Sequence, residues 1–330
     1  MAIELGPYDL LSLAGRGGMA TVFRGVHRRE GVPVAVKVLR ADTARDPEFR
    51  ELFANEVRVM AGLDHPHIAR VYDYGEISAA CSAASEGRLE SGSPYIVMEW
   101  ASGGVLDPRK MVTSWSALRS ILRALLDALA HAHARDVVHR DLKPANVIVC
   151  TREDLRPGIK LVDFGVAHLW STEQQDDARL FGTPRFMAPE QAIRDVRDLG
   201  PWTDLYALGC LAFTAATGSA PFHGASTAEL IAAHVDAPVP ALSPRFDVPS
   251  GFEAWVQRLL EKSPERRFRR AADAAYALFA LDPAVFGSIR GHELDPEGYD
   301  DATTLTALRI SDSALPTAVL PHTLEAAPPS

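Results

Sequence analysis

Short stretches in which apolar and polar residues alternate fill the first hundred residues of the chain. Between residues 8 and 39 glycines interrupt the alternation, which is typical of strands joined by tight turns. Segments 68–74 and 95–100 have the same character and predict two more strands. A helix is expected after residue 39, where Asp46-Pro47 is a start signal. Its apolar residues recur at helical spacing: Phe49, Leu52, Phe53, Val57 and Met60.

Residues 78–93 interrupt this strand-rich part with small and polar side chains and two glycines. Such a composition carries no apolar periodicity that would predict a helix or a strand. We interpret the segment as an inserted, mobile surface loop.

The pattern changes after Ala101, where longer helical repeats replace the alternation. Residues 114–135 predict a long helix, and the nearly apolar stretch 205–216 predicts a buried one. Short strands are expected at 147–150 and 159–162. A strand-rich part followed by a helix-rich part predicts an α+β protein with two lobes.

The same changes of pattern divide the chain into three regions. Residues 1–101 are expected to form a β-rich lobe with one main helix, and residues 102–281 a helical lobe. From 282 to 330 threonine, proline, alanine and acidic residues dominate and the apolar spacing is lost. This composition predicts a flexible tail.

Charge and cysteine content narrow the classes of function. The net charge of −9 makes nucleic-acid binding a poor expectation, because phosphate backbones attract basic proteins. Cys81, Cys150 and Cys210 are widely spaced, so neither a disulfide framework nor a zinc site is predicted. No apolar stretch reaches the roughly 20 residues that cross a bilayer, and no signal peptide is recognised. We therefore expect a cytoplasmic location without a membrane span.

A glycine-rich segment near the start is the first candidate for phosphate chemistry. Gly15, Gly17 and Gly18 precede Val22, and Ala20 stands where a third glycine would complete the G-x-G-x-x-G-x-V pattern. Glycines let backbone amides approach phosphate oxygens closely. Alone, the segment predicts a glycine hairpin equally well, and no Gly-Lys-Ser/Thr follows that would make it a Walker A motif.

A second candidate is Lys37, at the end of the apolar run Val34-Ala35-Val36. A lysine is costly to bury unpaired, and Glu56 on the predicted helix is its candidate partner. Taken alone, a strand lysine that points to solvent is the more common arrangement.

The third segment decides between these alternatives. His139-Arg140-Asp141-Leu142-Lys143-Pro144-Ala145-Asn146 precedes a predicted strand, and Asp163-Phe164-Gly165 follows. With these motifs the chain resembles the eukaryotic-like, or Hanks-type, protein kinases. Leu142-Lys143-Pro144 resembles their Ser/Thr class, and Gly17-Gly18-Met19-Ala20 resembles the bacterial PknB-like group. The resemblance covers roughly residues 8–281 and continues through Ala188-Pro189-Glu190, Asp204 and Arg267.

The resemblance implies a two-lobed protein-kinase fold and ATP-dependent phosphorylation of Ser/Thr hydroxyls, with autophosphorylation, in bacterial signalling. It implies ATP and Mg2+ as cofactors, with Mn2+ as a substitute. The catalytic residues that it implies are Asp141, Lys143, Lys37 and Glu56. The metal ligands that it implies are Asn146 and Asp163. The nucleotide-binding residues that it implies are Leu13, Gly15, Arg16, Gly17, Gly18, Val22, Ala35, Lys37, Met98, Glu99, Ala101 and Ile148.

Two structural roles and one further ligand contact also follow from the resemblance. Asp204 is expected to accept backbone N–H groups of the segment that contains Asp141. Glu190 is expected to pair with Arg267. Asp107 is expected to lie near the ribose, although Pro108 beside it makes this region unusual.

The activation segment departs from the family pattern. Residues 173–181 contain no hydroxyl group that could be phosphorylated, yet Arg140, which meets the phosphate in such kinases, is retained. Asp176 or Asp177 could supply a built-in negative charge to Arg140, or the segment could be a solvated acidic loop. The sequence leaves both open.

Protein substrates with Ser or Thr are the implied partners. Threonines of the tail, such as Thr303 and Thr304, could dock a phosphothreonine-reading partner, and relatives can form homodimers. The alternative function is a catalytically weak or partner-activated scaffold with the same fold. A small-molecule phosphotransferase is disfavoured, because such enzymes typically lack the Ala-Pro-Glu segment.

Overall fold

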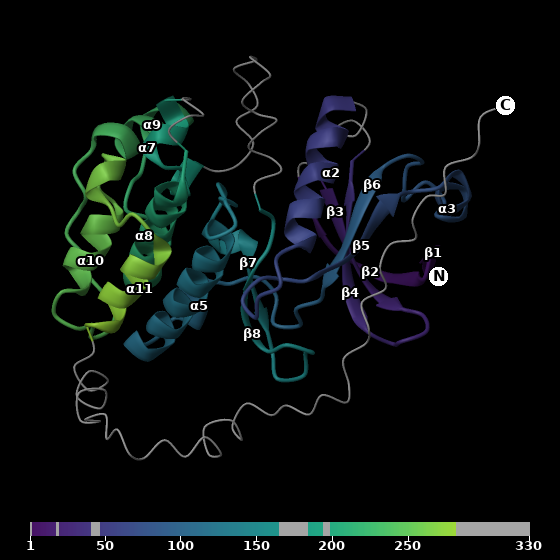
Figure 1. The fold of residues 1–330 in the computed structure, drawn as a ribbon, viewed down its shortest axis with the longest axis horizontal. Coiled ribbons are helices and arrows are strands. Elements are labelled where there is room, and N and C mark those ends of the chain that lie inside the picture. The colour runs from purple at the N-terminus through teal and green to yellow at the C-terminus, as the bar shows by residue number, and fades with distance from the viewer. Residues whose placement is uncertain (1, 18–19, 41–46, 165–183, 194–198, 282–330) are drawn as a thin grey trace, which may run out of the picture. The chain divides into compact units, whose positions relative to one another are not determined.

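Six strands form one antiparallel sheet in the order β1-β2-β3-β4-β6-β5 (Figure 1). Their bounds are β1 Ile3–Leu5, β2 Tyr8–Arg16, β3 Ala20–His27, β4 Pro33–Leu39, β5 Val71–Glu76 and β6 Pro94–Glu99. The sequence predicted all of these strands except β1, which is too short to show a pattern. Strand β5 begins three residues later than expected, because Ile68 instead forms an isolated bridge with Leu161.

This computed structural model describes residues 2–17, 20–40, 47–164, 184–193 and 199–281. Within α2 (Pro47–Ala61) it describes the backbone throughout, but not the side chains of residues 47–50, 52, 55 and 56. The chain divides into two units, Met1–Asp282 and Pro283–Ser330. The predicted tail, residues 282–330, lies outside the described residues.

Apolar side chains cover both faces of the sheet. Val34, Val36 and Val38 of β4 lie in one cluster of buried residues, while Ala35 and Leu39 lie in another. The second cluster contains Phe53 and Val57 of α2, so α2 covers that face. Because side chains alternate along a strand, Lys37 shares the α2 face with Ala35 and Leu39.

Residues 78–93 differ from the prediction of an irregular mobile loop. They contain helix α3 (Ala79–Ala84), whose N-terminus is capped by Ser78 Oγ accepting the Cys81 N–H at 3.1 Å. Cys81 Sγ donates to the Glu4 carbonyl, and Leu89 is buried in the same cluster as β1. The prediction failed because the surface that Cys81 and Leu89 cover is built by β1, the strand that the pattern did not show.

Helices dominate the second part of the chain (Figure 1). Their bounds are α4 Pro108–Met111, α5 Trp115–His133, α7 Pro189–Ile193, α8 Pro201–Thr217, α9 Thr227–Asp236, α10 Phe252–Leu259 and α11 Ala271–Phe279. Short 3-10 turns lie at Pro144–Asn146, Pro184–Phe186 and Pro264–Arg266, and β7 (Val147–Cys150) pairs with β8 (Gly158–Leu161). The α+β architecture, with a β-rich and a helical lobe, is thus confirmed.

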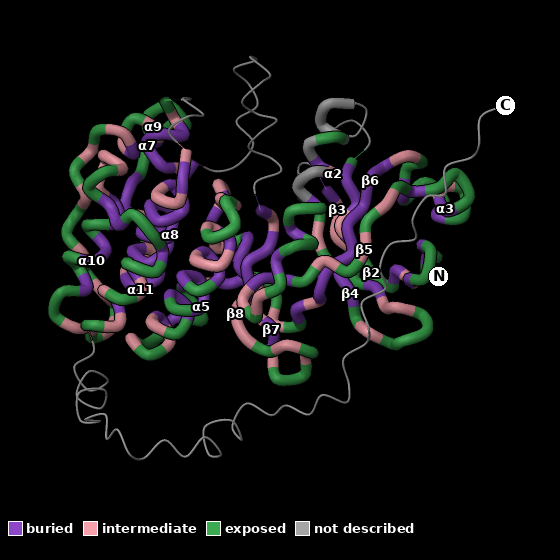
Figure 2. The backbone as a smooth tube through the Cα atoms, in the orientation of Figure 1, coloured by how far each residue is buried: buried purple, intermediate pink, exposed green. Residues whose placement is uncertain are grey.

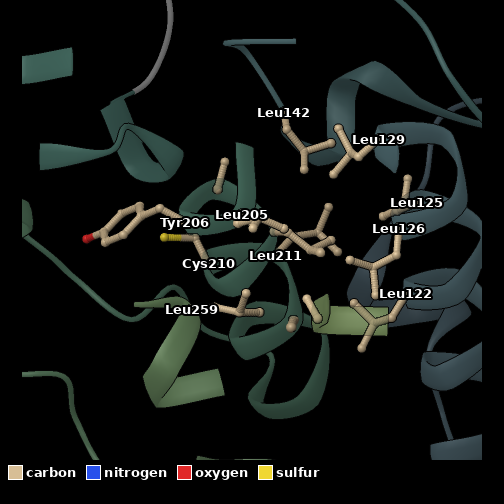
Figure 3. Packing of buried hydrophobic residues seen from close by; sticks show 14 of the residues in the cluster. Leu122, Leu125, Leu126, Leu129, Leu142, Leu205, Tyr206, Cys210, Leu211 and Leu259 are labelled. Carbon is tan, nitrogen blue, oxygen red and sulfur yellow. The ribbon is translucent and has the colours of Figure 1, made fainter. Parts of the chain in front are cut away.

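Helices α5 and α8 form the centre of the helical lobe. Figure 3 shows leucines of α5 beside leucines of α8, with Leu142 and Leu259 above and below them. Most residues of α8 are buried, as Figure 2 also shows, which confirms the buried helix predicted at 205–216. Within the part of the chain that the structure describes, no helix is long and apolar enough to span a bilayer.

A buried ion pair fastens α7 to the segment before α11, as the resemblance implied. Arg267 is 1% exposed, and its guanidinium donates to both carboxylate oxygens of Glu190 at 2.7 and 2.9 Å. Further donors of Arg267 bond the carbonyls of Glu261, Trp202 and Lys262. The same arginine therefore joins three separate segments of the helical lobe.

Replacing this arginine should destabilise the fold strongly. In Arg267→Ala the carboxylate of Glu190 would stay buried without its partner, which costs about 3–5 kcal/mol of unfolding free energy. Chemical denaturation would measure the loss. Arg266→Ala is the matched control, because the neighbouring side chain is 74% exposed and should change stability by less than about 0.5 kcal/mol. Equal effects of the two substitutions would contradict this account.

Candidate active site

One buried carboxylate holds the loop that contains Asp141. Asp204 on α8 accepts the backbone N–H groups of His139 at 2.8 Å and Arg140 at 2.7 Å. It also lies 2.8 Å from His133 Nε2 on α5. This confirms the role that the resemblance implied for Asp204.

The loop adopts an uncommon backbone conformation at Arg140, whose φ is +64°. Non-glycine residues rarely occupy this left-handed region, and they do so where the surrounding structure enforces it. Here the two bonds to Asp204 enforce it. The turn places the next residue, Asp141, at the surface of the helical lobe with its side chain 34% exposed.

Two side chains converge on one oxygen of Asp141. Lys143 Nζ donates to Oδ2 at 2.7 Å, and Asn146 Nδ2 donates to the same oxygen at 2.9 Å. Asn146 Nδ2 also bonds the Asp141 backbone carbonyl at 2.8 Å. All hydrogen bonds described for this carboxylate use Oδ2, so Oδ1 is the atom that can accept a proton from a bound hydroxyl group.

A second carboxylate, that of Asp163, lies in the segment after β8. Asp163 Oδ1 accepts a bond from Lys37 Nζ at 2.7 Å, which joins the sheet to the helical lobe. Its φ is +58°. Burial raises the pKa of Asp163, but the charges of Lys37, His139 and Lys143 outweigh this effect and hold the pKa below its usual range. The carboxylate is therefore ionised at neutral pH.

Asn146 and Asp163 are suited to a hard divalent cation. The bonds described for Asn146 side chain use Nδ2, which directs its Oδ1 away from Asp141. Asp163 bonds Lys37 through Oδ1 alone. Amide and carboxylate oxygens are the ligands that Mg2+ and similar ions prefer. The donor set thus fits the predicted metal site.

For Glu56, the partner predicted for Lys37, the structure describes the backbone but not the side chain. Glu56 is on α2, which packs on the face of the sheet that Lys37 shares, but its side chain is outside the described residues. The pair Lys37–Glu56 therefore stays a prediction. The pair with Asp163 was missed, because no local pattern shows that two residues 126 positions apart meet.

Four of the five apolar residues predicted to contact a nucleotide base come together. Ala35 and Met98 are buried in the cluster beside α2, and Val22 and Ile148 pack against it. Leu13 lies on β2 and is 50% exposed. The four side chains that pack together come from β3, β4, β6 and β7, so strand pairing and lobe contact are both needed to assemble them.

The described part of the glycine-rich segment lies at the end of β2 and the start of β3. Gly15 pairs with Val22 and Arg16 with Thr21, and Gly17 N–H donates to the Ala20 carbonyl at 2.8 Å. A hairpin at this position is therefore compatible with the prediction that the segment binds phosphate. Gly18 lies outside the described residues.

The connection after β6 contains features that sequence reasoning missed. The Glu99 N–H bonds the Arg70 carbonyl at 2.9 Å, and the Glu99 side chain is buried in ion pairs with Arg156 and Lys160. Asp107 caps α4, because its Oδ1 accepts the Arg109 N–H at 3.0 Å. Its contact with a ribose stays a prediction. Arg156 and Lys160 lie 57 and 61 positions beyond Glu99 in the chain, so no local pattern predicted their ion pairs with Glu99.

The site combines two lysine ammonium groups with the carboxylates that they contact. Lys37 and Lys143 lie beside Asp163 and Asp141, respectively. Such an arrangement can hold a polyanionic phosphate chain with a divalent cation while Asp141 receives a proton. It combines binding of a phosphate donor with activation of a hydroxyl acceptor.

The comparisons with known proteins agree with this chemistry. The family described as protein kinase domain matches residues 8–276. Serine/threonine-protein kinase PknH of Mycobacterium bovis is 33% identical over 328 residues, covering 98% of this chain and 52% of that protein. Serine/threonine-protein kinase PknA of Mycobacterium tuberculosis is 35% identical over 280 residues, covering 84% and 61%. The chain thus spans about half to three fifths of these relatives.

A solved structure is similar over nearly its whole length. The PknI kinase domain of Mycobacterium tuberculosis matches with a TM-score of 0.62 and 26% identity, covering 85% of this chain and 98% of that one. This similarity confirms the predicted two-lobed fold.

Substitution of Asp204 tests how the loop is held. In Asp204→Asn the amide nitrogen replaces an acceptor, so at least one of the N–H groups of His139 and Arg140 loses its partner, at a cost of about 1–3 kcal/mol. Hydrogen exchange of the peptide that contains residues 139–141 should become faster. Asp247→Asn is the control, because Asp247 is exposed. Unchanged exchange in Asp204→Asn would show that the loop is held by other contacts.

Proposed function

The chain belongs to the protein kinase domain family, and on this premise we propose that it transfers the γ-phosphate of ATP to Ser and Thr hydroxyls of proteins in bacterial signalling. Autophosphorylation is part of the proposal. The single observation that supports it most is the convergence of Lys143 and Asn146 on Asp141 Oδ2.

The proposed reaction assigns one step to each charged residue. Asp141 Oδ1 orients the substrate hydroxyl and accepts its proton, while the hydroxyl oxygen forms a bond to the γ-phosphorus and the bond to the β-phosphate oxygen breaks, which releases ADP. Lys143 stabilises the negative charge of the group in transfer. Bound Mg-ATP supplies the phosphoryl group and the cation that neutralises its charge.

Positioning of the nucleotide is assigned to the sheet and to the connection after β6. Lys37 is proposed to bind the α- and β-phosphates, oriented by Glu56. Leu13, Val22, Ala35, Met98 and Ile148 are proposed to enclose the adenine, and the backbones of Glu99 and Ala101 to bond its edge. The glycine-rich residues Gly15, Arg16, Gly17 and Gly18 are proposed to cover the phosphates.

The Ser/Thr class rests on two observations. Leu142-Lys143-Pro144 resembles that class, and the relatives PknH and PknA are named serine/threonine-protein kinases.

Mg2+ is the proposed ion at Asn146 and Asp163, with Mn2+ as a substitute, and the cytoplasm is the proposed location. The homodimer and the phosphothreonine-reading partner of the tail stay predictions from the sequence.

The direct test is transfer of labelled phosphate from ATP to the chain and to a generic protein substrate. Asp141→Asn should reduce the rate by roughly 10²–10⁴-fold, because a positioned base contributes that much. Asp273→Asn, an exposed position on α11, should match the wild type. A chelator should abolish transfer, and Mg2+ should restore it. Nucleotide binding without any transfer would instead support the scaffold alternative.

Arg140 carries the second testable part of the proposal. Within the described residues its Nε is buried and has no hydrogen-bond partner, so this guanidinium has unused capacity for an anion. Asp176 and Asp177, which lie outside the described residues, are the acidic groups that we propose for it. A carboxylate carries about one charge where a phosphate carries −1.5 to −2, so only part of a phosphate effect is expected.

The double substitution Asp176→Asn and Asp177→Asn should lower the transfer rate several-fold, because the neutral amides no longer attract Arg140. The same pair of substitutions in an Arg140→Ala background should have no further effect. Asp300→Asn with Asp301→Asn removes two charges elsewhere and serves as the control. An unchanged rate in the first variant would favour the solvated acidic loop.

A further inference from the structure

The turn between β7 and β8, residues 151–157, contacts the end of β6 and the residues that follow it, on both sides of Ala101. We propose that Asp154 and Arg156 of this turn are positioning residues, which fix the backbone of Glu99 and Ala101 in the conformation that receives the adenine edge. The inference rests on the proposed function, because it concerns nucleotide binding at the same site.

Arg156 holds the connection on its first side. The Glu99 side chain is 2% exposed, and its Oε1 accepts a bond from Arg156 Nε at 3.2 Å. Arg156 Nη2 contacts Glu99 Oε2, and Lys160 Nζ lies 3.5 Å from Oε1. A carboxylate this deeply buried is stable only when it is paired, so Glu99 cannot turn away from Arg156 without a large cost.

The same cluster ties this point to the segment between α2 and β5. Arg156 also donates to the carbonyls of His65 at 3.3 Å and Ile68 at 3.0 Å. Lys160, which is fully buried, donates to the Pro66 carbonyl at 2.7 Å. The position of Glu99 is therefore set relative to both lobes, and not only by the pairing of β6 with its neighbours.

Asp154 holds the connection on its second side. Its Oδ2 accepts the Ser102 N–H at 3.0 Å, the Ser102 hydroxyl at 2.8 Å and the Thr151 N–H at 2.6 Å. These bonds hold the pKa of Asp154 below its usual range in spite of partial burial, which raises it. The carboxylate stays ionised at neutral pH, and bonds to an ionised acceptor are the stronger kind.

A third contact leaves the backbone little freedom beyond Ser102. Gly103 N–H donates to the Val149 carbonyl at 2.9 Å. A side chain at Gly103 would place its Cβ 2.6 Å from that carbonyl oxygen, so only glycine fits. Between the anchors at Glu99 and Ser102 lie two residues, Trp100 and Ala101. Their peptide groups are presented in one conformation before a ligand arrives, which lowers the entropic cost of binding.

The experiment compares nucleotide affinity and turnover in variants of the turn. Arg156→Ala should raise the Kd for ADP, measured by titration calorimetry, and the KM for ATP by roughly tenfold, since a loss of about 1.4 kcal/mol has that effect. The kcat at saturating ATP should stay within about twofold, because Asp141 and its partners are untouched. Arg156→Lys should recover part of the affinity. Arg152→Ala, an exposed position in the same turn, is the matched control and should bind ADP as the wild type does.

Asp154→Ala provides an independent variant in case Arg156→Ala does not fold, and it should raise the Kd for ADP in the same direction. Asp154→Asn, which keeps one oxygen acceptor, should fall between it and the wild type. Wild-type affinity in folded Arg156→Ala or Asp154→Ala would overturn the inference. A higher kcat in either variant would also overturn it, because the turn would then restrain the enzyme. A wild-type chain that binds ADP but transfers no phosphate would refute the proposed function while the Kd values still decide the positioning role.

Discussion

The buried carboxylate of Asp204 is the constraint on which the candidate site depends. It lies on α8, whose side chains are almost all hidden in the core, so packing fixes its position. A charge removed from water must keep its hydrogen bonds, and Asp204 obtains them from His139, Arg140 and His133. The loop supplies two of these donors with Arg140 at positive φ. The location of Asp141 is therefore a consequence of how the helical core packs.

Other buried charges also hold separate segments together, at positions farther from Asp141. Glu190 with Arg267 joins α7 to the segment before α11, and Glu99 with Arg156 joins the end of β6 to the turn after β7. A buried ion pair adds little net stability compared with apolar packing, but it is costly to break. The apolar clusters thus supply most of the stability, while these pairs specify which segments must meet.

Local patterns predicted the elements well and their contacts poorly. The spacing of apolar residues identified α5 and α8. Helix α5 buries one face, so its apolar residues recur at helical spacing, and α8 is buried on most sides, so its sequence is nearly all apolar. Helix α3 was missed because β1 supplies the surface that it covers. The motifs predicted Asp141, Asn146 and Asp163 as a group, yet the bond from Lys37 to Asp163 and the ion pairs of Glu99 join residues far apart in the chain. No local pattern records such pairs.

The position of Lys37 explains how a kinase fold could be complete and still differ in activity. Its ammonium group has three donors, and one of them bonds Asp163 at 2.7 Å. That bond fixes the lysine against the helical lobe, whereas Glu56 would fix it against α2 within the sheet-bearing lobe. Both partners can be satisfied at once only when α2 lies close to the sheet and the lobes approach each other. The proposed pair of Lys37 with Glu56 therefore depends on the placement of α2, which packs on the face of the sheet that Lys37 shares.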